Sequence, residues 1–199
     1  MSSQAEFFDS YADRWDSMEH EDICARLDRV VRESGIGPGM DILDVGTGTG
    51  VLIPSLLKAM DNSGSILAID ISQGMLQVAM SRGFPDNVHF QLADIEEFDC
   101  PDCSFDRVMC NAVFPHFTNK HAALTEIHRL LRPGGLLVVS HPIGREGVNR
   151  IHREAGSVVA EDRVPDAPKM RQMLEIAGFV DVRVTDEPEF YLAIGRRRR

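Results

Sequence analysis

The sequence has few of the features that mark membrane, secreted or nucleic-acid-binding proteins. No apolar run approaches the roughly 20 residues that cross a bilayer. The first residues carry neither the basic start nor the apolar stretch of a signal peptide. Only 21 basic residues stand against 31 acidic ones, and the net charge of −10 disfavours general affinity for nucleic acid or anionic membrane. We therefore expect a cytoplasmic protein.

Cysteine is also scarce, with four in 199 residues and no spacing typical of a disulfide-rich domain. Cys100 and Cys103 form a C-x-x-C, but no second pair is present to complete a zinc site. We interpret this stretch as a surface loop, with a metal or redox role as the alternative.

Basic residues cluster at the end of the chain, where Arg196 to Arg199 form a run of four arginines. Such a run is typical of a solvated, disordered tail, and contact with RNA or a phosphate is the alternative. The remaining composition is ordinary for a soluble globular domain, with 43% hydrophobic and 26% charged residues. The length suits one domain, for which we expect an N-terminal helical segment (1–35), an α/β core (36–195) and a basic tail (196–199).

The most informative segment is Asp44-x-Gly46-x-Gly48-x-Gly50, which follows a short apolar run typical of a buried strand. Apolar residues at helical spacing come next, so the pattern predicts a strand, a tight glycine turn and the start of a helix. Glycines let a backbone approach a ligand closely, and a helix start presents free N–H groups. A dinucleotide fingerprint would need glycine at position 51, where this chain has Val51, and no phosphate-binding lysine is present.

This segment resembles the first motif of the class I S-adenosylmethionine (SAM) dependent methyltransferases. The methionine end of SAM carries an ammonium and a carboxylate, for which an aspartate and the adjacent backbone N–H groups are suitable partners. The alternative is a glycine turn that only packs the strand on the helix. The resemblance implies that SAM is bound here by Asp44, Gly46, Thr47, Gly48 and Gly50.

Two further strands are predicted to end on carboxylates. Residues 65–70 end at Asp70, where an acidic side chain can accept hydrogen bonds from both ribose hydroxyls of a nucleoside. The resemblance assigns this role to Asp70 and packs Ile71 against adenine. It also places Asp94 on the adenine amino group, with Ile95 beside it. Without the resemblance, Asp70 is a carboxylate that leads into a helix and Asp94 is a solvated turn residue.

Residues 104–111 predict a fourth strand, and the stretch around its end resembles the family pattern F-D-x-V-x-x-N-A-x-x-x-H. The resemblance implies that Asn111 lies beside the SAM methyl group. His116 and His141 are our candidates for a general base, with packing or hydrogen bonding as the alternative for His116. Family members that methylate adenine or glutamine carry Asn-Pro-Pro-aromatic here, so Asn-Ala-Val-Phe disfavours that branch.

The N-terminal residues 5–17 have the spacing of an amphipathic helix, with Phe8, Tyr11 and Trp15 on one face. Packing on the core is the simplest interpretation. The segment also resembles the lid that crosses the SAM site in quinone-methylating members of the family, which makes Tyr11 and Trp15 candidate substrate contacts. A second amphipathic helix is expected before a glycine-rich stop at residues 35–39.

The segment after the fifth strand concentrates two histidines and three arginines in an acidic chain. In the family this connection runs over the acceptor side of the site, and arginines bind carboxylate or phosphate bidentately. We therefore hypothesise an anionic acceptor bound by Arg145, Arg150 and Arg153. One alternative is a solvated helix with local ion pairs. Another is a metal held by His116, His141 and His152, although we assign no metal ligands.

The remaining patterns complete the predicted fold. Helices are expected over 119–131, capped by Thr118 or Asn119, and over 166–177, capped by Asp166. Strands are expected over 87–93, 136–140, 179–184 and 189–194, with a turn at 132–135. We predict a single α/β domain with a Rossmann-like, doubly wound sheet. In the family this sheet has seven strands, mostly parallel with the last antiparallel, and helices on both faces.

The sequence therefore predicts a SAM-dependent methyltransferase that acts on a small-molecule acceptor, with residues 1–35 as a lid over a SAM-binding core. One alternative is a methyltransferase-like subunit or sensor that binds SAM without turnover. A second is an RNA-directed enzyme steered by the arginine run, and a third is a nicotinamide oxidoreductase. The sequence does not identify the acceptor, the methylated atom or the oligomeric state.

Overall fold

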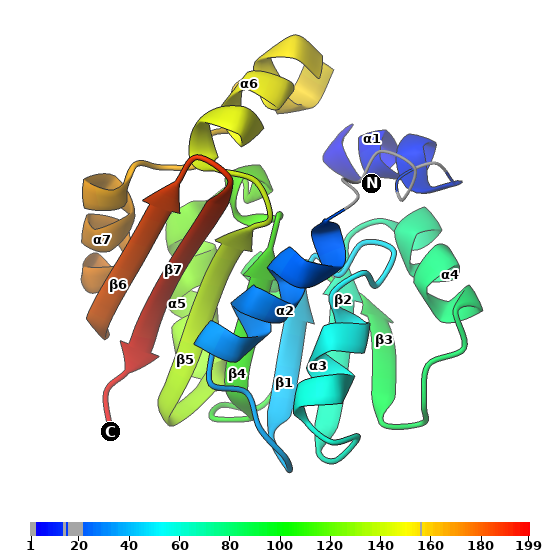
Figure 1. Ribbon diagram of the computed structural model, residues 1–199, viewed down its shortest axis with the longest axis vertical. Coiled ribbons are helices and arrows are strands. Elements are labelled where there is room, and N and C mark those ends of the chain that lie inside the picture. Colours follow the sequence, from blue (N-terminus) through cyan, green and yellow to red (C-terminus); the bar gives the residue numbers. More distant parts are fainter. Residues whose placement is uncertain (1–2, 14, 16–21, 156) are drawn as a thin grey trace.

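The computed structural model describes residues 3–13, 15, 22–155 and 157–199. Its centre is a seven-stranded sheet in the order β3-β2-β1-β4-β5-β7-β6, in which β7 alone runs antiparallel to its neighbours β5 and β6 (Figure 1). The predicted fold class is confirmed. The strands are β1 (Asp41–Val45), β2 (Ser65–Asp70), β3 (Val88–Leu92), β4 (Phe105–Asn111), β5 (Leu131–His141), β6 (Phe179–Glu187) and β7 (Phe190–Arg197).

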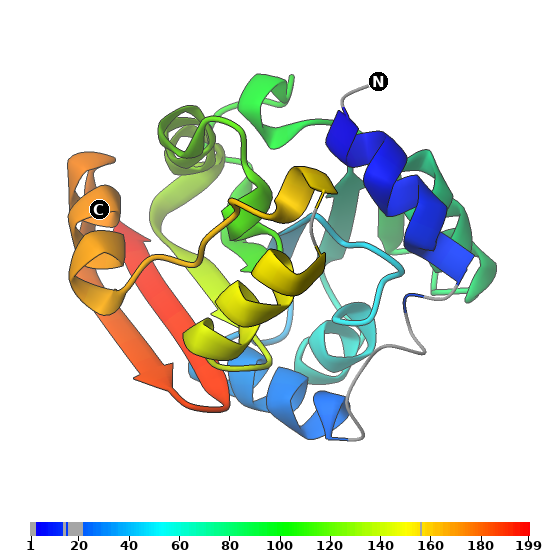
Figure 2. The ribbon, with the colours of Figure 1, turned by 90° about the horizontal axis from the view of Figure 1, so that it is seen from above.

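Helices cover both faces of this sheet, and two more lie across its upper edge. Seen from above, α1 and α6 lie over the carboxyl ends of the parallel strands (Figure 2). None of the helices in the described part of the chain is long and apolar enough to span a membrane. The helices are α1 (Ser3–Tyr11), α2 (Ile23–Glu33), α3 (Ile53–Ala59), α4 (Gln73–Ser81), α5 (Lys120–Leu130), α6 (Arg145–Ala155) and α7 (Ala167–Ile176), with short 3-10 turns η2 (Ile95–Glu97), η3 (Phe114–His116) and η4 (Ser157–Val159).

The central strands β1 and β4 are buried on both faces because successive side chains enter different apolar clusters. In β1, Ile42 packs with α2 and α3 while Leu43 packs with α5 and α7. In β4, Met109 joins the first cluster and Val108 the second. This alternation is the period of two expected of a strand, and it explains why the strands read as continuous apolar runs.

The helix starts follow the predicted caps. The Ser72 hydroxyl accepts a hydrogen bond from the amide of Met75 at 3.0 Å, and the Asp166 carboxylate accepts one from the amide of Lys169 at 2.9 Å. Of the two caps proposed for α5, Asn119 is the one used, through the amide of Ala122. These contacts satisfy amides that have no partner inside the helix.

Two element boundaries differ from the sequence expectation. The N-terminal helix ends at Tyr11 rather than near residue 17, and residues 14 and 16–17 of the predicted span lie outside the described residues. The expected turn at 132–135 belongs to β5, which begins at Leu131 with an irregular register against β4. Ion pairs of Arg132 with Asp41 (2.8 Å) and Asp106 (2.6 Å) hold this stretch against the starts of β1 and β4.

The expectation of a disordered tail from position 196 is wrong for its first two residues. Strand β7 runs to Arg197, which pairs with Phe179 of β6. The Arg196 side chain forms an ion pair with Asp181 at 2.9 Å, and that of Arg197 donates to the carbonyl of Arg129 at 2.9 Å. The chain ends at the edge of the sheet opposite α1 and α6 (Figure 1).

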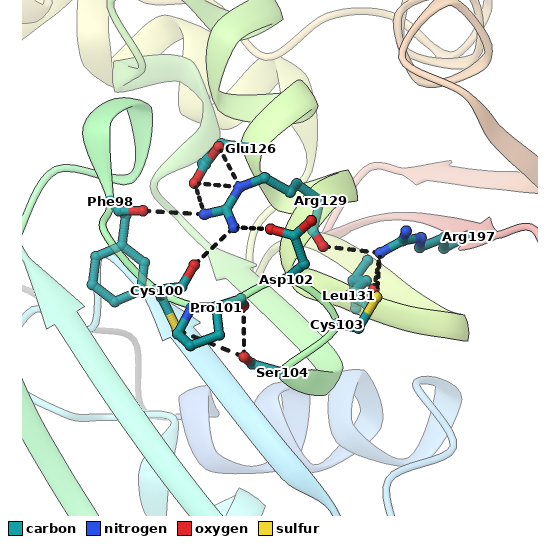
Figure 3. Close-up of polar contacts among 10 residues, drawn as sticks. All are labelled: Phe98, Cys100, Pro101, Asp102, Cys103, Ser104, Glu126, Arg129, Leu131 and Arg197. Atoms are coloured by element: carbon teal, nitrogen blue, oxygen red, sulfur yellow. Dashed lines mark hydrogen bonds and ion pairs between the residues drawn. The ribbon is translucent and has the colours of Figure 1, made fainter.

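The C-x-x-C lies in a loop that Arg129 of α5 holds against the start of β4 (Figure 3). The Arg129 guanidinium donates to the carbonyls of Phe98 and Cys100 and forms ion pairs with Asp102 and Glu126. All four cysteines are free thiols, and the Cys103 sulfur accepts a hydrogen bond from Arg197 at 3.3 Å. Since β4 begins here and ends at the other edge of the sheet, this loop is remote from the strand ends that carry the predicted site.

Candidate functional site

One cavity of about 320 Å³ lies at the carboxyl ends of the strands, beneath α1 and α6. Its volume is within the usual range of ligand pockets, and the carboxyl edge of an open α/β sheet is the usual place for one. Five strand ends contribute one polar side chain each, within two positions of the last residue of the strand. These side chains are Asp44, Asp70, Asp94, Asn111 and His141.

The glycine turn has the geometry that its residues predict. Gly46 has a φ of +65°, and a Cβ at that position would lie 2.3 Å from the side chain of Val113. Gly48 has a φ of +56° with open space around it, and both glycines line the cavity. Gly50 also has a positive φ, but it faces Phe84 and does not line the cavity.

The backbone amides of the glycine turn donate to groups of the protein itself, which the sequence did not suggest. The amide of Gly48 donates to Asp70 at 2.8 Å, that of Thr47 to the carbonyl of Ile69 at 3.0 Å, and that of Gly50 to the carbonyl of Thr47 at 2.9 Å. These amides already have partners, so they are not the free N–H groups we expected for a ligand carboxylate. The Thr47 hydroxyl donates to Asp44 at 2.7 Å, which orients that carboxylate.

The lining of the cavity is acidic. Burial raises the pKa of Asp44 to about 7, and the charge of Asp70 adds to this rise while the Thr47 hydrogen bond opposes it. Burial also raises the pKa of Asp70, against the amides of Ser72, Gly48 and Ile71. No lysine or arginine of the described residues lines the cavity, whereas four carboxylates do. Such a site favours a cationic ligand, because a positive charge would relieve the mutual repulsion of the buried carboxylates.

The adenine-binding and methyl-facing candidates lie along the same wall. Ile71 and Ile95 line the cavity, and Asp94 is exposed in it and caps η2 by accepting from the Glu96 amide at 2.9 Å. The Asn111 amide oxygen accepts from the Ser140 hydroxyl at 2.9 Å, which fixes its orientation.

Ala112, beside Asn111, has a φ of +57°. A left-handed conformation is uncommon for alanine and carries strain that the surrounding structure must offset. The chain turns sharply here, and the next residue, Val113, lies against Gly46 of the glycine turn.

Three histidines line the other end of the cavity. His116 Nδ1 lies 2.7 Å from the Asp162 carboxylate, and the rings of His116 and His152 have centroids 4.8 Å apart. His152 Nδ1 donates to the backbone carbonyl of Asp162 at 2.9 Å. His141 is buried, and its Nε2 has no hydrogen-bond partner among the residues that the structure describes. Burial, with His116 and His152 nearby, lowers the pKa of His141 to about 3.

The predicted lid does lie over the cavity, but it contributes different residues from those expected. The Phe8 ring contacts the rings of Trp15 (centroids 5.9 Å apart) and His116 (5.1 Å), and both Phe8 and Trp15 line the cavity. Tyr11 does not line it, and its ring packs on Phe7 instead. The reason is that α1 ends at Tyr11, so helical spacing no longer relates Tyr11 to Trp15.

None of the three predicted arginines lines the cavity. Arg145 forms an ion pair with Asp186 of β6 at 2.8 Å, and Arg150 and Arg153 are exposed on α6. The side of α6 that lines the cavity carries Val148, Ile151 and His152. The cavity wall formed by α6, where an acceptor is expected, is therefore made of apolar side chains and a histidine. It lacks the cationic side chains that would bind an anion.

Sequence reasoning missed two residues of this end, Asp162 and Gln4. The amide of Gln4 in α1 donates to the Asp162 carboxylate at 3.4 Å. In the sequence, Asp162 stands between Glu161 and Arg163 and has the appearance of a solvated turn residue, so only tertiary contacts reveal its role. Within the described parts of the chain, no group of three or more His, Cys, Asp or Glu side chains is placed to hold a metal ion, so the geometry gives no support to the metal alternative.

Comparison with known proteins gives consistent matches along most of the chain. A family model described as a methyltransferase domain matches residues 36–178. The ubiquinone/menaquinone biosynthesis C-methyltransferase UbiE of Hahella chejuensis is 31% identical over an alignment that covers 89% of this chain and 83% of that protein. The protein of the same name from Shewanella pealeana is 28% identical, with 82% and 76% covered.

Solved structures share the fold. A SAM-dependent methyltransferase from Aquifex aeolicus superposes with a TM-score of 0.74 and 24% identity, covering 92% of this chain and 96% of that one. A methyltransferase from Haloferax volcanii, solved in complex with the activator Trm112, superposes with a TM-score of 0.79 and 21% identity, covering 96% and 98%.

Proposed function

Since the chain belongs to the SAM-dependent methyltransferases, we propose that it transfers the SAM methyl group to a carbon or hydroxyl oxygen of a small, largely apolar acceptor. His116 is the general base in this proposal. The observation that carries it is the division of one continuous cavity into an acidic end, at the tips of β1 to β3, and an apolar end with three histidines.

The acidic end suits SAM in charge and shape. Asp44 would pair with its ammonium, Asp70 would accept from the ribose hydroxyls, and Asp94 would accept from the adenine amino group. Ile71 and Ile95 would flank the adenine ring. The sulfonium supplies an electrophilic methyl group, and the protein's task is to exclude water and align the acceptor with it.

The apolar end suits an uncharged acceptor with one or two polar groups. Phe8, Trp15 and Ile151 form its walls, and the nearby arginines are paired or point outward, so we no longer favour an anionic acceptor. The UbiE relatives are described as C-methyltransferases of ubiquinone and menaquinone biosynthesis. That description supports an aromatic acceptor with an acidic ring carbon or a hydroxyl group.

The two histidine candidates have different roles in this proposal. His116 contacts a carboxylate through Nδ1, so its Nε2 can take a proton from the acceptor as methyl transfer proceeds. His141, with a pKa near 3, stays neutral at physiological pH and is a weak base. Its unpartnered Nε2 is better suited to a hydrogen bond with an oxygen atom of the acceptor.

The test is methyl transfer from methyl-labelled SAM to a panel of phenols, quinols, thiols, amines and carboxylate-bearing analogues. We expect labelled product from quinols or phenols, and roughly a hundredfold lower kcat in His116→Gln with unchanged SAM affinity. The matched control is His121→Gln, an exposed histidine on α5, which should keep full activity. Turnover confined to thiols or amines, or full activity of His116→Gln, would reject the proposal.

Neither of the main alternatives gains support from the geometry. A subunit that binds SAM without turnover would need no base at the apolar end, and release of labelled methyl to any acceptor excludes it. An RNA-directed enzyme steered by the arginine run would need those arginines near the cavity, but they lie at the opposite edge of the sheet.

A further inference from the structure

The contact between His116 and Asp162 is shielded from water, unlike an ordinary surface ion pair. The two side chains are 10% and 17% exposed, and their closest atoms are 2.7 Å apart. The residues come from different parts of the chain, His116 from η3 after β4 and Asp162 from the turn after η4. In such surroundings a hydrogen bond to a carboxylate is strong and fixes geometry.

Three other elements hold Asp162 in place. Its carboxylate accepts from the Gln4 amide of α1, and its backbone carbonyl accepts from Nδ1 of His152 on α6. Its own amide donates to the carbonyl of Val159 at 3.0 Å. The backbone of Asp162 is therefore held by α6 and η4, and its side chain cannot turn away without breaking its contacts to Gln4 of α1 and to His116.

We propose that Asp162 is a positioning residue, which holds His116 in the tautomer with hydrogen on Nδ1 and presents the lone pair of Nε2 to the acceptor. This inference rests on the proposed methyl transfer and adds a residue to it. An ionised carboxylate only accepts hydrogen bonds, so the facing nitrogen must carry the hydrogen. Without such a partner, neither nitrogen is fixed as the basic one.

The same carboxylate acts again when the proton moves. The O–H or C–H bond of the acceptor breaks, the proton joins Nε2 of His116, and the electron pair left on the acceptor attacks the methyl carbon as the carbon–sulfur bond breaks. The imidazolium formed has Asp162 as its counter-charge, and Asp162 stays ionised throughout. Burial lowers the pKa of His152, so that ring stays neutral beside the new charge rather than competing for the carboxylate.

The first test is spectroscopic and needs no acceptor. Long-range proton–nitrogen NMR of the full chain, labelled with ¹⁵N-histidine, reports which nitrogen of each neutral imidazole carries hydrogen; His116 is assigned by the signals lost in His116→Gln. We expect the Nδ1–H tautomer in the wild type and in Glu161→Gln, whose side chain is the exposed neighbouring acid. In Asp162→Ala, which leaves Nδ1 without its acceptor, the preference for the Nδ1–H tautomer should be lost. An Nε2–H tautomer in the wild type would overturn the inference.

The second test is kinetic and uses the acceptor that the panel identifies. Asp162→Asn should lower kcat about a hundredfold, with acceptor KM and SAM affinity within about twofold of the wild type. Asp162→Glu, which keeps a carboxylate, should recover part of the lost kcat. An unchanged kcat in Asp162→Asn would overturn the inference. If Asp162→Asn does not fold, the inference is tested by the tautomer of His116 in the wild type and by the kcat of Asp162→Glu.

Failure of the methyl-transfer proposal would show differently. In that case the wild type turns over no acceptor, while the NMR spectrum still reports whether Asp162 holds His116 as Nδ1–H.

Discussion

The Asp9 carboxylate on α1 accepts a hydrogen bond from the Ser72 hydroxyl at 2.5 Å. The same oxygen accepts from the amide of Gly74 at 2.9 Å, at the N-terminus of α4. Because Ser72 follows Asp70 by two positions, this contact fastens the covering helix directly beside the proposed ribose site. The position of α1 and the geometry of the proposed SAM-binding end are therefore linked.

Loss of this contact should loosen α1. We expect Asp9→Ala to lower the free energy of local opening of α1 by about 1–2 kcal/mol, since a hydrogen bond to a charged group is removed. Faster amide hydrogen exchange in residues 5–11, with weaker SAM binding, is the measurement. Asp13→Ala, which removes an exposed acid just beyond the same helix, should change neither quantity. Equal exchange rates in the two variants would contradict this account of the lid.

SAM affinity should depend on pH through Asp44. The ligand-free pKa near 7 means that this carboxylate is largely protonated below neutral pH, whereas pairing with an ammonium requires the ionised form. Affinity should therefore rise with pH between about 5.5 and 7, approaching tenfold per unit at the acidic end. Isothermal titration across this range is the measurement, and Asp44→Asn should flatten the profile and weaken binding. A flat wild-type profile would argue against Asp44 as the ammonium partner.

The same substitution should stabilise the ligand-free protein. A carboxyl group whose pKa is raised by folding opposes folding when ionised, and this penalty is fully present above the folded-state pKa. At pH 8 we expect Asp44→Asn to raise the free energy of unfolding by roughly 2 kcal/mol, and the gain should shrink as pH falls toward 4. Urea unfolding at both pH values tests the sign; a loss of stability at pH 8 would be contrary to it.

The two glycines of the turn should respond differently to alanine. Gly46→Ala adds a Cβ that overlaps Val113 as well as a strained φ, and should destabilise the protein by about 2–4 kcal/mol. Gly48→Ala meets only the φ penalty of about 1 kcal/mol, yet its Cβ would enter the open space of the cavity and weaken SAM binding. Gly37→Ala, with neither restraint, is the control for thermal unfolding. Equal destabilisation by Gly46→Ala and Gly48→Ala would contradict this prediction, since it would mean that Val113 moves aside for the added Cβ.

The exposed arginines of α6 should not contribute to acceptor affinity. We expect Arg150→Ala and Arg153→Ala to leave the acceptor KM within about twofold of the wild type, because neither side chain lines the cavity. Ile151→Ala on the same helix should raise the KM severalfold, since it removes apolar contact area from the cavity wall. A large rise in KM for either arginine variant would restore the anionic-acceptor hypothesis.

Much of the fold could be predicted because its signals are local. Apolar runs predicted the strands, Ser72 and Asp166 predicted helix starts, and parallel strands place their carboxyl ends at one edge. Asp44 and Asp70 therefore had to lie close together once the sheet was predicted, without any knowledge of loop geometry.

The rest of the site depends on contacts between distant parts of the chain. His116 and Asp162 are separated by 46 positions and meet only because the segment after β5 folds back over the cavity. Arg145 is likewise held by a residue far away in the sequence, because its ion pair with Asp186 directs it away from the cavity. Charged side chains on a helix can face a ligand or a neighbouring strand equally well, and their spacing does not decide between the two.

The central claim is that the carboxylates at the strand tips bind SAM, and titration calorimetry of the purified chain with SAM and with its demethylated product tests it most directly. We predict binding of one ligand per chain in the wild type and at least tenfold weaker binding in Asp70→Ala, while the exposed-site variant Asp86→Ala binds normally. Absence of binding heat in the wild type, or affinity unchanged by Asp70→Ala, would contradict the claim.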